Sequence, residues 1–199
     1  MVYQAAEYSQ IPLINGGNGC DEHPTQALLD LYTIEQETGR IDDLTIGLVG
    51  DLLHARTIHS LVKGLSRYRV KMVLISPEEL QLPEVLREFL QTRGCEYAEG
   101  SDLREMIEQL DVLYIVMLQH HRIANRAIIE QLRNTYYHIT PELLQSAQAD
   151  LILLHPLVRM EEVASEVDDL PHAAYFRQAH NGVFVRMALL ELMLKGELL

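Results

Sequence analysis

Apolar residues follow two alternating patterns along the chain, and together these patterns predict an α/β fold. Short continuous apolar runs are typical of strands that are buried on both faces. Five runs fit, the third only weakly: 44–51, 70–76, 95–99, 112–118 and 150–157. Between them, apolar residues return at helical spacing, and strands that alternate with helices pair in parallel through right-handed crossovers. We therefore predict a doubly wound, mostly parallel sheet of about five strands, flanked by helices.

Helical spacing is clearest in six segments. Helix is expected over 23–38, 58–65, 82–93, 103–110, 123–147 with a break at Pro141, and the end of 174–199. Pro24 suits a first helical position, and Gly39 suits a helix end. The last helix has an apolar arc too broad for one neighbouring face, so it should pack on a partner or a second domain. We divide the chain into a connecting segment (1–22), one domain (23–173) and this helix (174–199).

Composition and charge narrow the classes of function. The 199 residues suit one domain, with 48% hydrophobic and 23% charged residues. A net charge of −13 disfavours nucleic acid or an anionic membrane as the main partner. No apolar run approaches the roughly 20 residues of a membrane span, and the first residues lack a secretory pattern, which suggests the cytoplasm. Cys20 and Cys95 form no metal-binding spacing and are expected to be buried thiols.

Several polar residues follow the predicted strands. Ligands of open parallel sheets bind at the carboxyl ends of the strands, so the loops after 44–51, 112–118 and 150–157 should converge, with HPTQ (23–26) bordering the same region. These loops supply Arg56, Gln119, Arg122, His155 and Arg159. Such a set suits a small carboxylate or phosphate. The turn VGDLLHAR lacks the dinucleotide-binding glycines, and neither His120-His121 nor the pair His54 and His59 has the spacing of a zinc site.

Three stretches carry a family resemblance: HPTQALLDLYTI, VGDLLHARTIHSL, and LHPLVRMEEVASEVD followed by YFRQAHNGVFVRMALL. In this order they resemble aspartate/ornithine carbamoyltransferases, and LHPLxR favours the aspartate branch. The likeness runs from Ile11 to Leu194. It implies transfer of a carbamoyl group from carbamoyl phosphate to aspartate, the first committed step of pyrimidine synthesis, without a metal or other cofactor.

The resemblance also implies roles for individual residues. His23 matches the histidine at the carbamoyl carbonyl oxygen, and Gln26 the glutamine near the carbamoyl amide. Arg56 matches an arginine that binds the aspartate carboxylate, and Gln119 a glutamine of the aspartate pocket. Leu157 matches a leucine whose backbone lies beside the substrates. Arg159 is not expected to touch a substrate, because Glu161 and Glu162 lie close enough in sequence to pair with it.

The sequence also departs from the family pattern. It contains no Ser-x-Arg-Thr phosphate loop and no match for the serine and lysine that a neighbouring subunit supplies, so only the C-terminal, aspartate-binding domain is expected. Met117 stands where the family has a carboxylate-binding arginine, and Val158 where it has a proline, often in a cis peptide. His54-Ala55 replaces the usual pair before the loop arginine.

Three functions follow from these departures. Loss of the phosphate loop and of the arginine at Met117 favours a catalytically incompetent subunit that serves in binding or assembly. The alternatives are half of a split aspartate carbamoyltransferase that another chain completes, and a small-molecule sensor with a reshaped pocket. In each case the chain is expected to act as a homo-oligomer or beside a second protein, through the helix that begins at HPTQ and the last helix, with a small carboxylate as a possible ligand.

Overall fold

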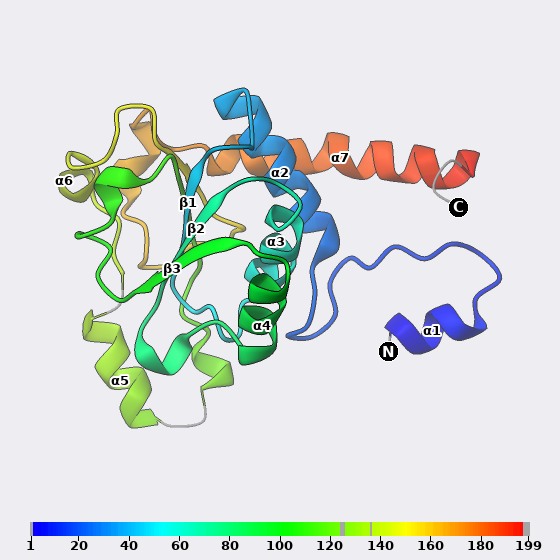
Figure 1. The fold of residues 1–199 in the computed structure, drawn as a ribbon, viewed down its shortest axis with the longest axis horizontal. Helices are drawn as coiled ribbons and strands as arrows, with labels where there is room; N and C mark the ends of the chain where they lie inside the picture. The colour runs from blue at the N-terminus through cyan, green and yellow to red at the C-terminus, as the bar shows by residue number, and fades with distance from the viewer. Residues whose placement is uncertain (1, 124–125, 136, 197–199) are drawn as a thin grey trace.

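A single parallel sheet forms the centre of the computed structural model, which describes residues 2–123, 126–135 and 137–196 (Figure 1). Its strand order is β3-β2-β1-β4-β5, and every neighbouring pair is parallel. The strands are β1 (Thr45–Val49), β2 (Lys71–Ile75), β3 (Glu96–Gly100), β4 (Val112–Ile115) and β5 (Ile152–Leu154). The order reverses on either side of β1, as a doubly wound fold requires. This confirms the predicted architecture.

Helices connect these strands. They are α1 (Val2–Tyr8), α2 (Pro24–Thr38), α3 (Arg56–Leu65), α4 (Glu84–Thr92), α5 (Arg126–Thr135), α6 (Pro141–Leu144) and α7 (Tyr175–Lys195). Short 3-10 turns lie at Glu78–Leu80, Ile107–Gln109, His120–Arg122 and Ser165–Asp169. Helix α2 ends as predicted, because Gly39 takes the left-handed conformation and its N–H donates to Glu35 O at 2.8 Å.

Two apolar layers cover the sheet. On one face α3 and α4 pack against alternate residues of the strands, such as Leu48, Leu74 and Tyr114. On the other face α6 and the 3-10 turns at Ile107–Gln109 and Ser165–Asp169 pack against the intervening residues, such as Val49 and Leu113. Because both faces are buried over β1, β2, β4 and β5, these strands read as continuous apolar runs, whereas the exposed edge strand β3 gives only a weak one.

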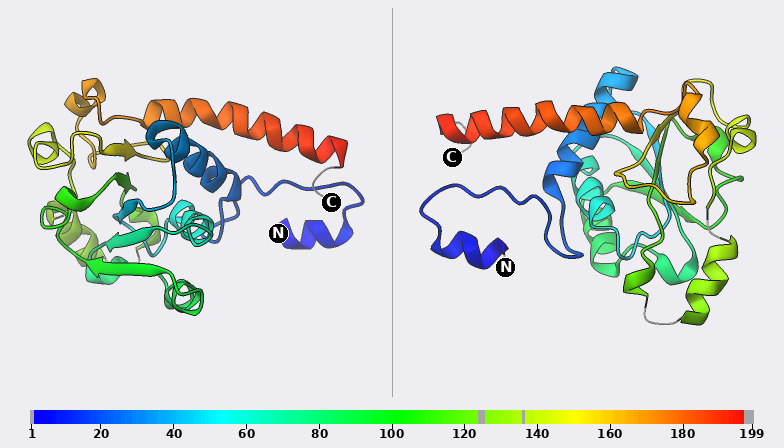
Figure 2. Two further views of the ribbon diagram at one scale, coloured as in Figure 1. Left: turned by 45° about the horizontal axis from the view of Figure 1, so that its top comes forward. Right: turned by 180° about the vertical axis from the view of Figure 1, so that it is seen from behind.

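The two ends of the chain lie beyond this core (Figure 2). Helix α7 starts beside the sheet and α2 and then projects away from the body, while α1 stands apart on the side to which α7 projects. The projecting part of α7 exposes large apolar side chains: Val183, Phe184, Met187, Leu190 and Leu194. Nothing within the described part of the chain covers this stripe, and its packing on a partner or a second domain stays a prediction.

Three expectations differ from the structure. The helix over 103–110 is only a 3-10 turn at Ile107–Gln109, and α1 was not expected at all. Cys20 is exposed and Cys95 half-buried, so neither is the fully buried thiol that the sequence suggested. Among the described residues, no helix is both long and apolar enough to cross a membrane.

Candidate functional site

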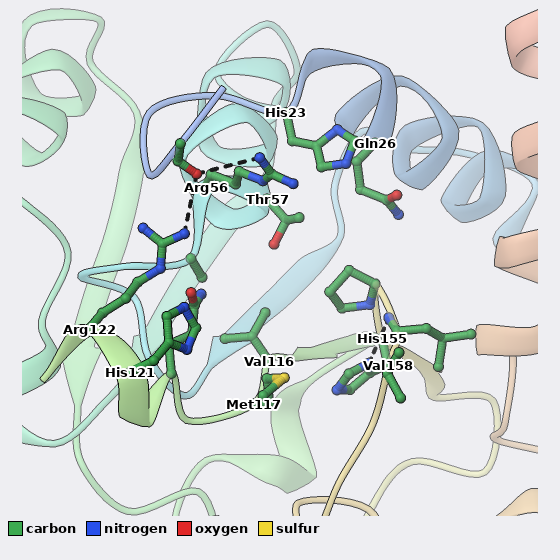
Figure 3. A pocket seen from close by; sticks show the side chains of 15 residues that line it. His23, Gln26, Arg56, Thr57, Val116, Met117, His121, Arg122, His155 and Val158 are labelled. Carbon is green, nitrogen blue, oxygen red and sulfur yellow. Dashed lines mark hydrogen bonds between the residues drawn. The ribbon is translucent and has the colours of Figure 1, made fainter. Parts of the chain in front are cut away.

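A pocket of about 390 Å³ opens at the carboxyl ends of the central strands (Figure 3). It lies where β1 and β4 adjoin, on either side of which the chain order reverses, and open α/β sheets bind ligands at such points. Its wall is built from five segments: the glycine-rich turn at Gly19, the start of α2, the start of α3, and the loops after β4 and β5. The lining residues are Gly19, His23, Gln26, Ala55, Arg56, Thr57, Val116, Met117, Gln119, His121, Arg122, His155, Pro156, Leu157 and Val158.

The start of α2 brings His23 and Gln26 to the pocket. His23 occupies the N-cap position but its side chain does not cap the helix, and its backbone N–H donates to Ser60 Oγ at 2.8 Å. Burial, with Arg56 and Arg186 nearby, lowers the pKa of His23, so the ring is neutral at pH 7. Its buried Nδ1 has no hydrogen-bond partner among the described residues. A neutral imidazole of this kind has a free polar group to offer a ligand.

Gln26 is oriented by the carboxyl group of Asp30, which lies one helical turn further along α2 and is fully buried. Gln26 Nε2 donates to Asp30 Oδ1 at 2.9 Å. Two further donors converge on the same carboxyl group: Gln178 Nε2 at 2.6 Å and Tyr114 Oη at 2.9 Å. Because the Gln26 amide nitrogen is held this way, its Oε1 is left as an acceptor.

Gln178 of α7 connects the Asp30 carboxyl group to the loop after β5. Gln178 also accepts a hydrogen bond from the backbone N–H of His155 at 2.8 Å. Burial raises the pKa of Asp30 to about 7, although the hydrogen bonds from Gln178, Gln26 and Tyr114 act in the opposite direction. The start of α2 and the β5 loop are therefore tied together through one buried acid.

The start of α3 places Arg56 beside a glycine-rich turn. Arg56 is the first residue of the helix, and its Nη1 donates to Gly19 O at 3.4 Å. Gly17, with a φ of 121°, packs so closely that a Cβ there would lie 2.9 Å from the Arg56 guanidinium carbon. Helix N-termini carry partial positive charge, so the starts of α2 and α3 and the Arg56 cation all favour an anion in this pocket.

Asp51 joins the loops after β1 and β4. Its side chain is fully buried and accepts hydrogen bonds from His54 N–H at 3.0 Å and from Gln119 N–H at 3.2 Å. Gln119 is therefore positioned through its backbone, with its side chain at the pocket wall.

The loop after β5 is fixed by His155. His155 Nδ1 accepts from Leu157 N–H at 2.9 Å, which leaves Nε2–H to donate to Glu162 Oε1 at 2.9 Å. Burial alone would raise the pKa of Glu162, but the hydrogen bonds from His155 and Met160 N–H outweigh it, and the pKa is lowered. The peptide bond between Leu157 and Val158 is cis.

The two sides of the pocket differ in polarity (Figure 3). Arg56 and Arg122 lie together on one side, whereas Val116, Met117 and Val158 form an apolar surface away from them. The basic side can bind an anionic group, and the other side can contact an apolar one.

All five residues that the resemblance singled out line this pocket: His23, Gln26, Arg56, Gln119 and Leu157. Arg122 and His155, predicted from their positions after the strands, join them. Arg159 does not line the pocket, and the expected pairing with Glu161 or Glu162 is wrong: it pairs with Asp168 and Tyr175 Oη. Within the described ranges, no three His, Cys, Asp or Glu side chains are grouped as metal ligands.

Sequence reasoning missed Thr57 and Pro156 in the lining, and Asp30, Tyr114 and Gln178 behind it. Thr57 and Pro156 directly follow residues that were singled out, so adjacency was an available signal. Asp30 carried a weaker one, its spacing of four residues from Gln26 on the same helix.

Family comparison matches this architecture to a known group of enzymes. Residues 42–193 match the model of the aspartate/ornithine carbamoyltransferase Asp/Orn binding domain. The chain belongs to the aspartate/ornithine carbamoyltransferase family. Residues 1–36 match the carbamoyl-P binding domain of the same family. The expectation that the chain carries only the aspartate-binding domain is thereby corrected, because α1 and most of α2 belong to the matched part of the other domain.

Similar proteins cover nearly all of the chain. It is 48% identical over 193 residues to the aspartate carbamoyltransferase catalytic subunit of Methanopyrus kandleri, and 46% identical over 192 residues to that of Pyrobaculum neutrophilum. Each match covers 96% of this chain, which spans 62% and 63% of the two relatives.

Solved structures agree with these matches. The catalytic subunit of M. jannaschii aspartate transcarbamoylase superposes with a TM-score of 0.89 at 42% identity, over 98% of this chain and 63% of that one. Aspartate transcarbamoylase from Trypanosoma cruzi, in complex with N-(phosphonacetyl)-L-aspartic acid, gives 0.85 at 39% identity, over 95% and 59%. The relatives are named catalytic subunits, and nothing in these matches supports the expected loss of catalysis.

Proposed function

We propose that this chain forms the carbamoyl- and aspartate-contacting part of an aspartate carbamoyltransferase active site. One observation carries the proposal: residues from the start of α2, the start of α3 and the loops after β4 and β5 meet in one pocket, and they include every residue to which the resemblance assigns a role. The reaction would transfer the carbamoyl group of carbamoyl phosphate to the amine of aspartate, in pyrimidine synthesis.

The pocket chemistry suits this reaction. The amine attacks the carbamoyl carbon, negative charge develops on the carbonyl oxygen, and phosphate leaves. A neutral His23 can donate to that oxygen, and Gln26 Oε1 can accept from the carbamoyl amide, because Asp30 holds the other end of the Gln26 side chain. Arg56 binds a carboxylate of aspartate and holds the amine in line for attack.

In this proposal another polypeptide supplies the contacts that hold the phosphate group. The sequence contains no Ser-x-Arg-Thr motif, and no basic side chain of the pocket is matched to the phosphate. The exposed stripe of α7 offers a large apolar surface to another protein that supplies these contacts.

A second function, ligand binding without turnover, is favoured by Met117 alone. A methionine cannot form the charge-assisted pair of the family's arginine, and such hydrogen bonds contribute about 1.5–3 kcal/mol each. Under this alternative the chain senses a carboxylate or serves in assembly, and it does not regain activity when a phosphate-binding unit is added.

Complementation separates the two functions. We expect that mixing the chain with a carbamoyl-phosphate-binding unit from a relative yields carbamoyl aspartate, and that Arg56→Ala reduces the rate at least about a hundredfold. The control Arg126→Ala removes an exposed arginine outside the pocket lining and should leave the rate unchanged. Thermal stabilisation by aspartate without any product in the mixture would favour the second function instead.

A further inference from the structure

Asp30 is a fully buried acid behind the pocket, and its two carboxyl oxygens have different partners. Oδ1 accepts hydrogen bonds from two side-chain amides, Gln26 Nε2 at 2.9 Å and Gln178 Nε2 at 2.6 Å. Oδ2 accepts from Tyr114 Oη at 2.9 Å. Of these three partners, only Gln26 lines the pocket (Figure 3). Asp30 therefore acts on the pocket from behind, through a side chain that a ligand can reach.

Neither amide on Oδ1 is free to turn round. Gln178 Oε1 accepts the backbone N–H of His155 at 2.8 Å, so Gln178 must present its Nε2 to Asp30. If the Gln26 amide turned, its Oε1 would face Oδ1 of Asp30, and two buried oxygens would meet without a hydrogen between them. The hydrogen bond to Oδ1 therefore sets which end of the Gln26 amide is available to a ligand.

A proton on Asp30 does not disturb this arrangement. Burial raises the pKa of Asp30 to about 7, while the hydrogen bonds to its oxygens and the charge of Arg186 on α7 favour the ionised form. Oδ1 already accepts from two amides, whereas Oδ2 faces the hydroxyl of Tyr114, which can accept as well as donate. Burial also raises the pKa of Tyr114, so this hydroxyl stays neutral. The proton therefore lies on Oδ2, and both amides keep their acceptor.

We propose that Asp30 is a positioning residue for the carbamoyl transfer, and that it orients the Gln26 amide through the acceptor oxygen Oδ1 and not through its charge. The inference rests on the proposed function, in which Gln26 Oε1 accepts from the carbamoyl amide. The same oxygen holds Gln178, so it also fixes the backbone of His155 relative to α2. A Gln26 side chain that is already ordered needs no further ordering when the carbamoyl group binds.

Two substitutions at position 30 separate the acceptor from the charge. In Asp30→Asn the side-chain oxygen can replace Oδ1, and the amide nitrogen can donate to Tyr114 Oη. Asp30→Ala removes the acceptor. In the complementation assay we expect Asp30→Ala to lower kcat about tenfold or more, with KM for aspartate changed less than about twofold, and Asp30→Asn to recover most of the lost rate.

A double variant shows whether Asp30 acts through Gln26. In a Gln26→Ala background, Asp30→Ala should lower the rate by no more than about a further twofold, because the group that it orients is already gone. Thr33→Ala is the matched control. It removes another buried side chain of α2 and its 3.0 Å hydrogen bond from Asn181 of α7, outside the pocket lining, and it should leave the rate unchanged.

Two further readouts do not require turnover. Succinate has the two carboxylates of aspartate but no amine or carbamoyl group, so calorimetry should give Asp30→Ala and the parent the same affinity for it. In NMR spectra, the side-chain amide protons of Gln26 should exchange slowly with solvent in the parent and in Asp30→Asn, and rapidly in Asp30→Ala. A loss of succinate affinity in Asp30→Ala as large as its loss of rate would contradict the inference.

These results distinguish the inference from the proposed function. Equal kcat in Asp30→Ala and the parent would overturn the inference, as would an Asp30→Asn variant that is as slow as Asp30→Ala. If Asp30→Ala does not fold, the parent and Asp30→Asn decide, because fast exchange of the Gln26 amide in either one contradicts the inference. A parent mixture that yields no carbamoyl aspartate would reject the proposed function, while the amide exchange still tests how Asp30 holds Gln26.

Discussion

Asp30 shows how a residue behind the pocket can control residues within it. Its carboxyl group accepts hydrogen bonds from Gln26 and Gln178, and through Gln178 it is connected to the backbone of His155. Helical periodicity gives the position of Asp30 on α2 but not its burial, since an aspartate in a helix is ordinarily assigned to solvent. The resemblance identified the side chains of the pocket, whereas the buried network that orients them becomes visible only once α2, α7 and β4 are packed together.

Asp30→Asn should change how stability depends on pH. Burial raises the pKa of Asp30 from 3.8 to about 7, so between these values the unfolded chain releases a proton that the folded chain keeps. The free energy of unfolding therefore falls as pH rises through this window, by about 4 kcal/mol from this group. Asparagine cannot ionise, so we expect urea midpoints of the variant to lose less between pH 4.5 and pH 7.5. Equal losses in variant and parent would contradict the role of Asp30.

Gly17→Ala tests the support of Arg56. At a φ of 121° an alanine is strained, and its Cβ would lie 2.9 Å from the Arg56 guanidinium carbon. We expect a loss of about 1–3 kcal/mol of stability and weaker succinate binding, because Arg56 must shift. Gly16→Ala is the control, since a Cβ there meets nothing within 4 Å. The account is wrong at this residue if both variants bind succinate as the parent does.

At the scale of elements, most long periodic segments were predicted well and short ones poorly. Segment 123–147, expected as helix with a break at Pro141, is an exception, because it forms only α5 and the four-residue α6. All five strands and helices α2, α3, α4 and α7 lie where apolar runs or helical spacing placed them. Helix α1 has seven residues and buries none of them, so no apolar pattern marks it. Segment 103–110 shows helical spacing, and its Leu103, Ile107 and Leu110 do belong to the buried core. The segment nevertheless forms only a three-residue 3-10 turn at Ile107–Gln109 and not an α-helix. Local pattern therefore indicates which face is buried more reliably than which element forms.

Helix α7 should join the chain to its partner. Leu190 and Leu194 are 51% and 86% exposed, so changing both to glutamate should cost this chain little stability but place charge in any apolar interface. We expect the double variant to sediment as a monomer and to lose complementation. The control pair Glu191→Gln and Lys195→Gln removes an exposed ion pair of the same helix and should still associate. Unchanged association of the leucine variant would exclude this stripe as the interface.

At the scale of the whole molecule, the proposed function needs contacts to the phosphate group that come from another polypeptide. Comparison assigns residues 1–36 to the carbamoyl-P binding domain and 42–193 to the Asp/Orn binding domain, and the pocket lies where the two matched parts meet at α2 and α3. The sequence motifs predicted this family and this pocket. They placed Arg56 and Arg122 in converging loops, but the contact of both side chains with Gly19 O becomes visible only in the folded chain.

The most direct measurement is the rate of carbamoyl aspartate formation while a carbamoyl-phosphate-binding unit is titrated into a fixed amount of the chain. Our account predicts no product from the chain alone, a rate that rises to a plateau near equal amounts, and almost no rate with Arg56→Ala at any ratio. Product from the chain alone would contradict the claim that its site is incomplete. No product at any ratio, with a folded and associated mixture, would contradict the claim that this pocket is part of a transferase.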